Sequence, residues 1–580
     1  MRSSLVVWLI LIWVASPFGY TQSGKTYCNP LDLDYRYNFE QKGRNISYRS
    51  GADPVLINHG GQYYLFSTIA GGFWRSTNLR DWRHVRPDGW PDRDVVAPAA
   101  LSAKGKLFLF PSTYEQRPIY LVAGTNPLSM FNPLLPYLPG APGPWDPSLF
   151  HDEDTGHWYM YFGSSNFYPL YGIELDYEKN LVYRGTAKEL IALRPEQHGW
   201  ERFGRDHRDT IKPFIEGAWM TKHDGKYYLQ YAAPGTEHNV YANGTYVGDA
   251  PLGPFTYAAN NPVSYKPGGF LTGAGHGNTF EDNHGNFWNT GTPWIAVNFD
   301  FERRIAMFPA GFDGDGLMFA NTRFGDFPHY LPTRKWEDKD ELFTGWMLLS
   351  YRKPCTASSV RYPYAAANVT DENPRTFWLA RSSAASEWLS VDLDHACEVR
   401  AVQVNFADYQ SGLFGPGTNV YTQFRLHHSL DGKTWNLTAD LSGERRDRPN
   451  AFIELTNAAR ARFIRYEHGH IGSPNLAISD LRVFGYGEEE LPATPAKLQV
   501  RRDADQRNAF LTWQEVPGAV GYNIRWGIQP DKLYQTYQVF ADQPTKLELR
   551  ALTVGQKYSF AIEAFNERGV SKLGKPVPID

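Results

Sequence analysis

The sequence predicts an all-β chain whose first half is a five-bladed β-propeller. Residues 212–231, KPFIEGAWMTKHDGKYYLQY, place an acidic residue, Glu216, ahead of two strand-forming runs that a short turn joins. A hairpin of this kind, repeated at intervals of some tens of residues, is typical of a propeller in which each copy is one blade. The other four copies begin at Asp53, Ala97, Asp146 and, more weakly, His276.

The residue ahead of each hairpin falls where the innermost strand of a blade begins. Such positions converge on the central axis although they lie far apart in the chain. They include Asp53, Asp146, Glu216 and His276. A single acid at a strand entry is more simply explained as a turn residue. Three acids and a histidine in equivalent positions favour a shared chemical site.

The residues around these acids resemble the three acidic signatures of glycoside hydrolase family 43, the five-bladed propeller glycosidases. They are ADP at Asp53, WDPS followed by DEDTGHWYMYFG at Asp146, and IEGAW at Glu216, and the resemblance covers about the first 330 residues. It implies an exo-acting, inverting glycosidase that removes terminal sugars from plant-type polysaccharide side chains. Among the family's activities we favour α-L-arabinofuranosidase, followed by β-xylosidase and exo-β-galactosidase.

Inversion needs two carboxyl groups in opposite charge states, about 6.5 to 9.5 Å apart. The resemblance implies that Asp53 is the general base that activates water and that Glu216 is the general acid. It assigns Asp146 as the auxiliary acid that orients Glu216 and raises its pKa, because a nearby negative charge disfavours ionisation.

Three further residues are candidates for the site. By resemblance, His276 in GAGHGNTF is a ligand of a hydrated calcium ion in the central channel, with waters completing the shell because hard cations prefer oxygen. The alternative is a histidine hydrogen-bonded across the channel without a metal. Trp74 in GGFWRST is a candidate stacking platform for sugar, or blade packing. Arg323 in ANTRFGD is a candidate for binding ring hydroxyls, or forms a surface ion pair.

Two other functions remain open at this stage. One is a non-catalytic, lectin-like propeller whose acids only bind sugar hydroxyls or calcium. The other is a retaining glycosidase with Asp53 as nucleophile, which a carboxyl separation near 5 Å would indicate. The family commonly has proline where this chain has Ala218, so the wall beside Glu216 is expected to differ.

The N-terminal residues 1–22 read as a signal peptide, with one positive charge and an apolar run of about ten residues that is too short to span a bilayer. We therefore expect a secreted or periplasmic protein without membrane insertion. The net charge of −4 gives no electrostatic argument for a nucleic-acid partner, which leaves an oligo- or polysaccharide as the expected partner.

Two β-sandwich domains are expected after the propeller. ANVTDENPRTFWLA, SEWLSVDLD and ISDLRVFG resemble the discoidin or F5/8 type C fold, in which Trp378, Trp388 and Trp435 would be core residues. LTWQEVPGAVGYNIRWG and LTVGQKYSFAIEAFNERGVSK resemble a fibronectin type III domain, in which Trp513 and Tyr558 would be structural. The expected divisions are a propeller at 23–332, a linker at 333–352, the discoidin-like domain at 353–487, a linker at 488–497 and the last domain at 498–580.

The chain has three cysteines, too few for a disulfide framework. One bridge between Cys355 and Cys397 remains open, because both fall in the discoidin-like segment.

Overall fold

The computed structural model describes most of the chain. The described residues are 25–36, 39–40, 45–49, 51–87, 90, 95–112, 120–122, 131–133, 145–167, 169–415, 417 and 419–580. The predicted signal peptide, residues 1–22, lies outside them. Among the described residues, none of the helices has the length and apolar character needed to cross a membrane.

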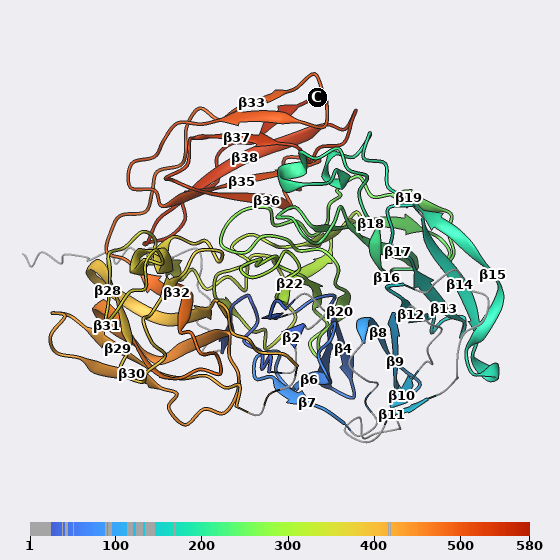
Figure 1. The fold of residues 1–580 in the computed structure, drawn as a ribbon. Coiled ribbons are helices and arrows are strands. Elements are labelled where there is room, and N and C mark those ends of the chain that lie inside the picture. The colour runs from blue at the N-terminus through green and yellow to red at the C-terminus, as the bar shows by residue number, and fades with distance from the viewer. Residues whose placement is uncertain are drawn as a thin grey trace, which may run out of the picture.

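Five four-stranded antiparallel sheets follow one another in the described part of residues 55–320, which confirms the predicted propeller (Figure 1). Each sheet keeps chain order from its inner to its outer strand. The strands are β4 (Val55–His59), β5 (Gln62–Phe66), β6 (Phe73–Ser76) and β7 (Arg83–Val85); β8 (Val96–Ala103), β9 (Lys106–Ser112), β10 (Tyr120–Val122) and β11 (Phe131–Pro133); β12 (Ser148–His151), β13 (Trp158–Phe162), β14 (Leu170–Asp176) and β15 (Val182–Ile191); β16 (Glu216–His223), β17 (Lys226–Ala233), β18 (Ala242–Gly248) and β19 (Phe255–Tyr257); β20 (Thr279–Glu281), β21 (Phe287–Gly291), β22 (Ala306–Phe312) and β23 (Met318–Ala320).

The first strands of the five sheets form a closed ring. Strand β4 lies beside β8, β8 beside β12, β12 beside β16, and β20 beside β4. The indole of Trp219 in β16 donates to the carbonyl of Thr279 in β20 across 3.0 Å, which joins the remaining pair. The residues that enter these strands are therefore held around one axis.

A left-handed backbone residue lies at the entry of the ring strand in every blade, either shortly before the strand or as its second residue. The φ angles are 53° at Asp53, 40° at Ala97, 46° at Asp146, 62° at Gly217 and 42° at His276. The residues predicted to occupy matching positions at the starts of the blades therefore do so in all but the fourth blade. There the matching residue is Gly217 and not Glu216. A Cβ atom on Gly217 would lie 3.0 Å from the ring of His276, so only glycine fits, and the acid is one residue earlier.

An eight-stranded sheet bends on itself to form the second domain. Its order is β25–β32–β28–β31–β29–β30, with β26 also pairing with β28 and β27 with β32. The long strands β28 and β31 change register along their pairing, as expected where one strand contributes to two layers. The strands are β25 (Met347–Leu348), β26 (Cys355–Ala357), β27 (Trp378–Leu379), β28 (Trp388–Phe406), β29 (Gln423–Ser429), β30 (Asn436–Asp440), β31 (Asn450–His470) and β32 (Ala477–Tyr486).

The core of this domain corrects two expectations. Trp378 is fully buried, as predicted. Trp388 and Trp435 are only half-buried, and the Arg465 guanidinium contacts both rings, 4.3 and 3.9 Å from their centroids. Cys355 and Cys397 are both free. Cys355 lies on β26 opposite Val391 of β28, whereas Cys397 lies six residues further along β28.

The last domain is a sandwich of a three-stranded and a four-stranded sheet, with orders β33–β34–β37 and β36–β35–β38–β39. Trp513 and Tyr558 are buried as predicted, and the Tyr558 hydroxyl accepts a hydrogen bond from the amide of Thr553 across 3.1 Å. The strands are β33 (Gln499–Arg502), β34 (Ala509–Thr512), β35 (Gly521–Gly527), β36 (Gln535–Phe540), β37 (Lys546–Leu549), β38 (Tyr558–Phe565) and β39 (Val577–Ile579).

The remaining elements are short. Strand pairs β1–β24 and β2–β3 flank the propeller, and four 3-10 helices lie among the described residues. Their bounds are β1 (Thr26–Tyr27), β2 (Phe39–Glu40), β3 (Tyr48–Arg49), β24 (His329–Tyr330), η1 (Tyr177–Lys179), η2 (Gly199–Glu201), η3 (Arg205–His207) and η4 (Ala366–Thr370).

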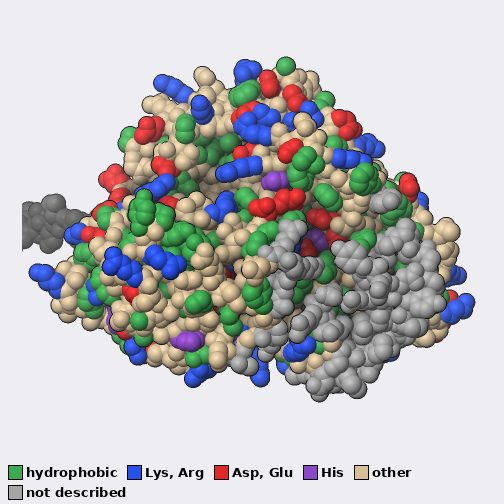
Figure 2. Space-filling view, viewed as in Figure 1, with side chains coloured by type: hydrophobic (Ala, Val, Ile, Leu, Met, Phe, Trp, Pro, Cys, Tyr) green, Lys and Arg blue, Asp and Glu red, His purple; other side chains and the backbone are tan. Residues whose placement is uncertain are grey.

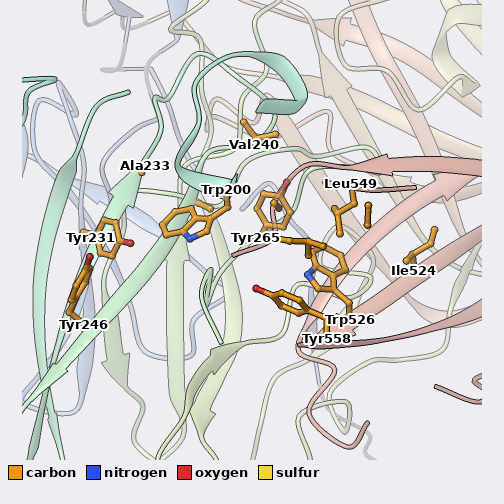
Figure 3. Packing of buried hydrophobic residues seen from close by; sticks show 14 of the residues in the cluster. Trp200, Tyr231, Ala233, Val240, Tyr246, Tyr265, Ile524, Trp526, Leu549 and Tyr558 are labelled. Carbon is orange, nitrogen blue, oxygen red and sulfur yellow. The ribbon is translucent and has the colours of Figure 1, made fainter. Parts of the chain in front are cut away.

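One apolar cluster joins the fourth blade to the last sandwich. Trp200 and Tyr265 of the propeller side pack toward Trp526 and Tyr558 of the sandwich, and all four side chains are buried (Figure 3). The centroids of the Tyr265 and Trp526 rings are 6.0 Å apart in an edge-to-face arrangement. A shared core of this kind fixes the last domain against the propeller.

Candidate active site

The three predicted acids and the predicted histidine meet at the propeller axis; we call these four residues the axis cluster. The His276 Nδ1 atom lies 3.1 Å from Oδ1 of Asp53 and 3.8 Å from Oδ2 of Asp146. Ligand atoms of Asp146, Glu216 and His276 all lie within 4.8 Å of one another. In Figure 2, acidic and histidine side chains gather in the hollow near the centre of the face. The structure therefore brings together all four side chains that the sequence placed on the axis.

Asp53 lies in an environment that favours its ionised form. Its Oδ2 atom accepts from the Thr68 hydroxyl across 2.5 Å, and the Arg303 guanidinium lies 3.9 Å from Oδ1. Burial alone would raise the pKa of Asp53, but His276, Arg303 and Thr68 together lower it below its ordinary value. Asp53 is therefore a carboxylate near neutral pH.

Asp146 and Glu216 have the opposite tendency. Burial raises the pKa of Asp146 to about 7, and the charges of Glu216 and Asp53 add to this while His276 opposes it. Burial also raises the pKa of Glu216, against the effects of His276 and of a hydrogen bond from Tyr241. Two neighbouring carboxyls with raised pKa values titrate as a pair and keep a shared proton near neutral pH.

Hydrogen bonds orient the Glu216 carboxyl from two blades. Its Oε1 atom accepts from the Tyr241 hydroxyl, and Oε2 accepts from the Ser164 hydroxyl across 3.1 Å. Tyr241 is fully buried ahead of β18, and Ser164 follows β13 in the preceding blade. The acid is thus fixed in position by groups whose own places are set by the sheets.

Sequence reasoning missed a repeated hydroxyl that links neighbouring blades. A serine or threonine near the end of the second strand of a blade bonds to the entry of the next blade in four of the five cases within the described residues. The Thr68, Ser112 and Thr292 hydroxyls accept from the backbone amides of Ala97, Asp146 and Asp53 across 2.8, 2.7 and 3.1 Å. The Ser164 hydroxyl instead donates to the Glu216 carboxyl across 3.1 Å. The runs FST, PST, GSS and TGT carried this signal.

Arg303 was also missed, because it lies in the long connection between β21 and β22, far from any hairpin motif. Its Nη1 atom donates to Thr236 across 3.1 Å and lies near Asp53. The same connection reaches the second domain, where the Arg375 guanidinium lies 4.2 Å from the Trp294 ring centroid. One loop thus joins the site to the neighbouring sandwich.

The structure contradicts the role expected of Trp74. The side chain is fully buried, and its Nε1 atom donates to the carbonyl of Asp34 across 2.9 Å. It lies on the inner-packing side of β6, among the apolar residues between the first and fifth blades. Trp74 is therefore blade packing and offers no face to a sugar.

Arg323 is likewise used elsewhere. Its Nε atom lies 2.6 Å from Oε1 of Glu563 in β38, and its Nη1 atom lies 3.4 Å from Oδ1 of Asp340. The side chain is almost buried between the propeller and the last sandwich, so it is not available to ring hydroxyls. Arg323 forms an ion pair, as the alternative interpretation predicted, but the pair lies inside the protein and not at its surface.

The residues around His276 give a partial fit to the predicted calcium ion. Nδ1 faces the two aspartates, which leaves Nε2 as the ring nitrogen that could face an ion in the channel. A single nitrogen is a weak donor for a hard cation, so waters would have to supply most of the coordination. Calcium therefore stays a prediction.

Comparison with known families agrees with two of the resemblances seen in the sequence, those of the propeller and of the discoidin-like domain. The family model described as Glycosyl hydrolases family 43 matches residues 44–295, and the model of the F5/8 type C domain matches residues 354–476. The first of these segments contains the whole axis cluster. The chain therefore contains a glycoside hydrolase domain of family 43 followed by an F5/8 type C domain.

Individual relatives are distant. A Xylosidase/arabinosidase of Bacteroides ovatus is 25% identical over 193 residues, which cover 29% of this chain and 56% of the relative. Xylosidase/arabinosidase 43A of Humicola insolens is 29% identical over 285 residues, covering 42% of this chain and 79% of the relative. A solved structure titled Glycoside hydrolase aligns with 18% identity and a TM-score of 0.45, covering 74% of this chain and 97% of the other. The chain thus spans just over half the length of the first of these relatives.

Proposed function

We propose that the chain is a secreted, exo-acting, inverting glycosidase whose best substrate is a terminal α-L-arabinofuranosyl residue on a plant-type polysaccharide. The observation that carries this proposal is the axis cluster. One buried carboxyl has a lowered pKa, and two others, 4.8 Å or less apart, have raised pKa values. This is the division of charge that inversion requires.

The proposed reaction gives each of the three acids a different role. Asp53 removes a proton from a water molecule that attacks the anomeric carbon, and His276 and Arg303 stabilise the carboxylate before the attack. Glu216 donates its proton to the leaving oxygen, so that the glycosidic bond breaks as the new bond forms. Asp146 disfavours ionisation of Glu216 by its proximity. After release, Glu216 regains a proton from solvent and Asp53 loses the one it gained.

β-Xylosidase activity is the alternative with direct support. Relatives carry the names Xylosidase/arabinosidase and Beta-xylosidase, and the latter, from Xylanibacter ruminicola, is 27% identical over 270 residues. Release of nitrophenol from a panel of aryl glycosides separates the possibilities. We expect the highest kcat/KM with the α-L-arabinofuranoside, and a higher value with the β-D-xyloside would replace the arabinofuranosidase proposal.

A sugar-binding propeller without catalysis would give a different result. In that case the acids would only bind hydroxyl groups, and no glycoside on the panel would be cleaved although calorimetry would detect binding. The raised pKa values of two buried carboxyls favour the enzyme, because strongly perturbed acids are typical of catalytic sites.

The accessory parts of the proposal rest on resemblance. We infer that the last sandwich is a fibronectin type III-like brace, with the domain divisions given above. The signal peptide would direct the chain to the periplasm or the medium, which N-terminal sequencing of the exported protein would test. A channel calcium ion would be bound by Nε2 of the neutral form of His276 together with waters, and its loss on treatment with EDTA should lower Tm.

A further inference from the structure

A second cluster of possible ligand atoms lies far along the chain from the axis cluster, where the F5/8 type C domain meets the last sandwich. Atoms of His395, Cys397 and Glu567 all lie within 4.8 Å of one another. Glu489 reaches the same place, with its Oε1 atom 3.1 Å from Nε2 of His395. The four residues offer one imidazole, one thiol and two carboxyls.

The local structure explains how these groups meet. His395 and Cys397 are two residues apart on β28, so both side chains can emerge on one side of the strand. Glu567 lies just after β38 in the last sandwich, and Glu489 lies in the segment that connects the two domains. The cluster therefore draws on both domains and on their connection.

The cluster's charges are in contact, but part of its hydrogen-bonding capacity is unused in the described residues. Glu567 is 6% exposed, and its Oε2 atom lies 3.4 Å from Nε2 of His395 without either atom making a hydrogen bond. The Cys397 thiol is fully buried and unoxidised. An unsatisfied buried carboxylate oxygen is costly, so these atoms are suited to a further binding partner.

We propose that His395, Cys397, Glu567 and Glu489 bind one zinc ion that ties the F5/8 type C domain to the last sandwich. Imidazole nitrogen, thiolate sulfur and carboxylate oxygen are the ordinary ligands of zinc, and structural zinc sites have four of them. Tetrahedral bonds of about 2.0 to 2.3 Å need donor atoms about 3.5 Å apart. Atoms of His395, Cys397 and Glu567 lie within 4.8 Å of one another, and side-chain rotation would bring Glu489, already 3.1 Å from His395, in as the fourth ligand.

The surroundings agree with this assignment. The Lys353 ammonium lies 2.8 Å from Oε1 of Glu567, which holds the carboxylate and leaves Oε2 for the ion. With a thiolate, two carboxylates, zinc and Lys353, the charges sum to zero. Zinc binds the thiolate form, so binding would displace the proton of the Cys397 thiol. The partly exposed His395 and Glu489 provide a route from solvent.

Zinc binding to the full-length chain tests this proposal. Protein stripped with a chelator is dialysed against zinc and then against buffer, and bound metal is counted by mass spectrometry. We expect one zinc ion per chain and a higher Tm than that of the stripped protein. Cobalt in place of zinc should give the near-ultraviolet charge-transfer absorption of a thiolate ligand.

Variants locate the ion. Cys397→Ser and His395→Ala should each lose the zinc and the rise in Tm, and His395 is partly exposed, so its replacement is compatible with folding. Cys355→Ser is the matched control, since this half-buried thiol lies in the same domain but outside the cluster. Glu216→Gln controls for binding at the axis cluster, and both controls should keep the metal. Equal zinc content in the wild type and His395→Ala, or loss of zinc in Glu216→Gln, would overturn the proposal.

Discussion

Two groups of buried charges in this molecule are built in opposite ways. In the axis cluster, three carboxyls face a single histidine, with Arg303 3.9 Å from one of them. Lys266, Asp326, Glu372 and Arg482 form a second group between the propeller and the F5/8 type C domain, which we call the junction cluster. There each acid has its own cation, at 3.1 Å for Lys266 to Asp326 and 2.9 Å for Arg482 to Glu372.

The difference separates a structural role from a catalytic one. Paired charges in the junction cluster hold Asp326 ionised, because Lys266 and Arg482 outweigh the burial that would raise its pKa. In the axis cluster, burial and then the charges of neighbouring acids raise the pKa values of Asp146 and Glu216, whereas in the junction cluster burial raises the pKa of Glu372 against its own cation, Arg482. Carboxyls that share too few cations can remain protonated near neutral pH, and a protonated carboxyl is what acid catalysis needs. The following changes test that contrast, beginning with the largest expected effect.

Asp53→Asn removes the ionised carboxyl from the axis cluster. We expect kcat/KM to fall by at least about 10²- to 10⁴-fold on both natural oligosaccharides and activated aryl glycosides, because water must still be activated in either case. Initial rates with the two substrate types provide the measurement. Full activity of the variant on both would remove Asp53 from the mechanism.

Glu216→Gln removes the proton donor and should depend on the leaving group. Hydrolysis of natural linkages should fall by about 10²- to 10⁴-fold, whereas an aryl glycoside whose leaving group needs no proton should lose much less. The ratio of the two kcat/KM values is the quantity to compare with the wild type. An equal loss on both substrates would show that Glu216 does not act as the acid.

Arg482→Met breaks the junction cluster and should affect stability instead of chemistry. Leaving Glu372 buried without its partner should cost about 3 to 5 kcal/mol in the free energy of unfolding, measured by denaturant titration. Replacing Arg425, whose pair with Asp440 is exposed, should leave the free energy of unfolding nearly unchanged and is the matched control. Similar losses of unfolding free energy in both variants would mean that the junction cluster stabilises the fold no more than an exposed ion pair does.

Asp146→Asn should produce the smallest change, in the pH profile. The charge of Glu216 raises the pKa of Asp146, and because this repulsion is mutual, removing the Asp146 carboxyl should lower the pKa of Glu216. Because Glu216 must be protonated to act, the alkaline limb of kcat/KM should move to lower pH, while the acid limb, set by Asp53, stays near its place. An alkaline limb that stays where it is would show that Asp146 does not act on the pKa of Glu216.

Local sequence predicted most of the axis cluster because each of its members precedes a recognisable hairpin. The hairpin pattern fixed the blade count and brought Asp53, Asp146 and His276 to equivalent positions. It failed by one residue at Glu216, since the left-handed position beside His276 accepts only Gly217. The clash that excludes a side chain at position 217 involves residues of two blades, so the sequence of either hairpin alone cannot predict it.

The errors concern residues whose roles depend on packing between distant segments. Trp74 and Arg323 follow hairpin and strand motifs near the expected site, but the first packs between blades and the second pairs with Glu563 of the last sandwich. Arg303 reaches the site from a loop without a motif. In each case the deciding neighbour is more than two hundred residues away, or lies in a different domain, so composition and periodicity could not identify it.

The central claim is that Asp53 activates water and does not attack the sugar itself. Proton NMR of the reaction with an aryl glycoside, recorded before mutarotation, reports the anomer that is released first. The account predicts a product whose anomeric configuration is inverted relative to the substrate. A first product with retained configuration would contradict it and would make Asp53 a nucleophile.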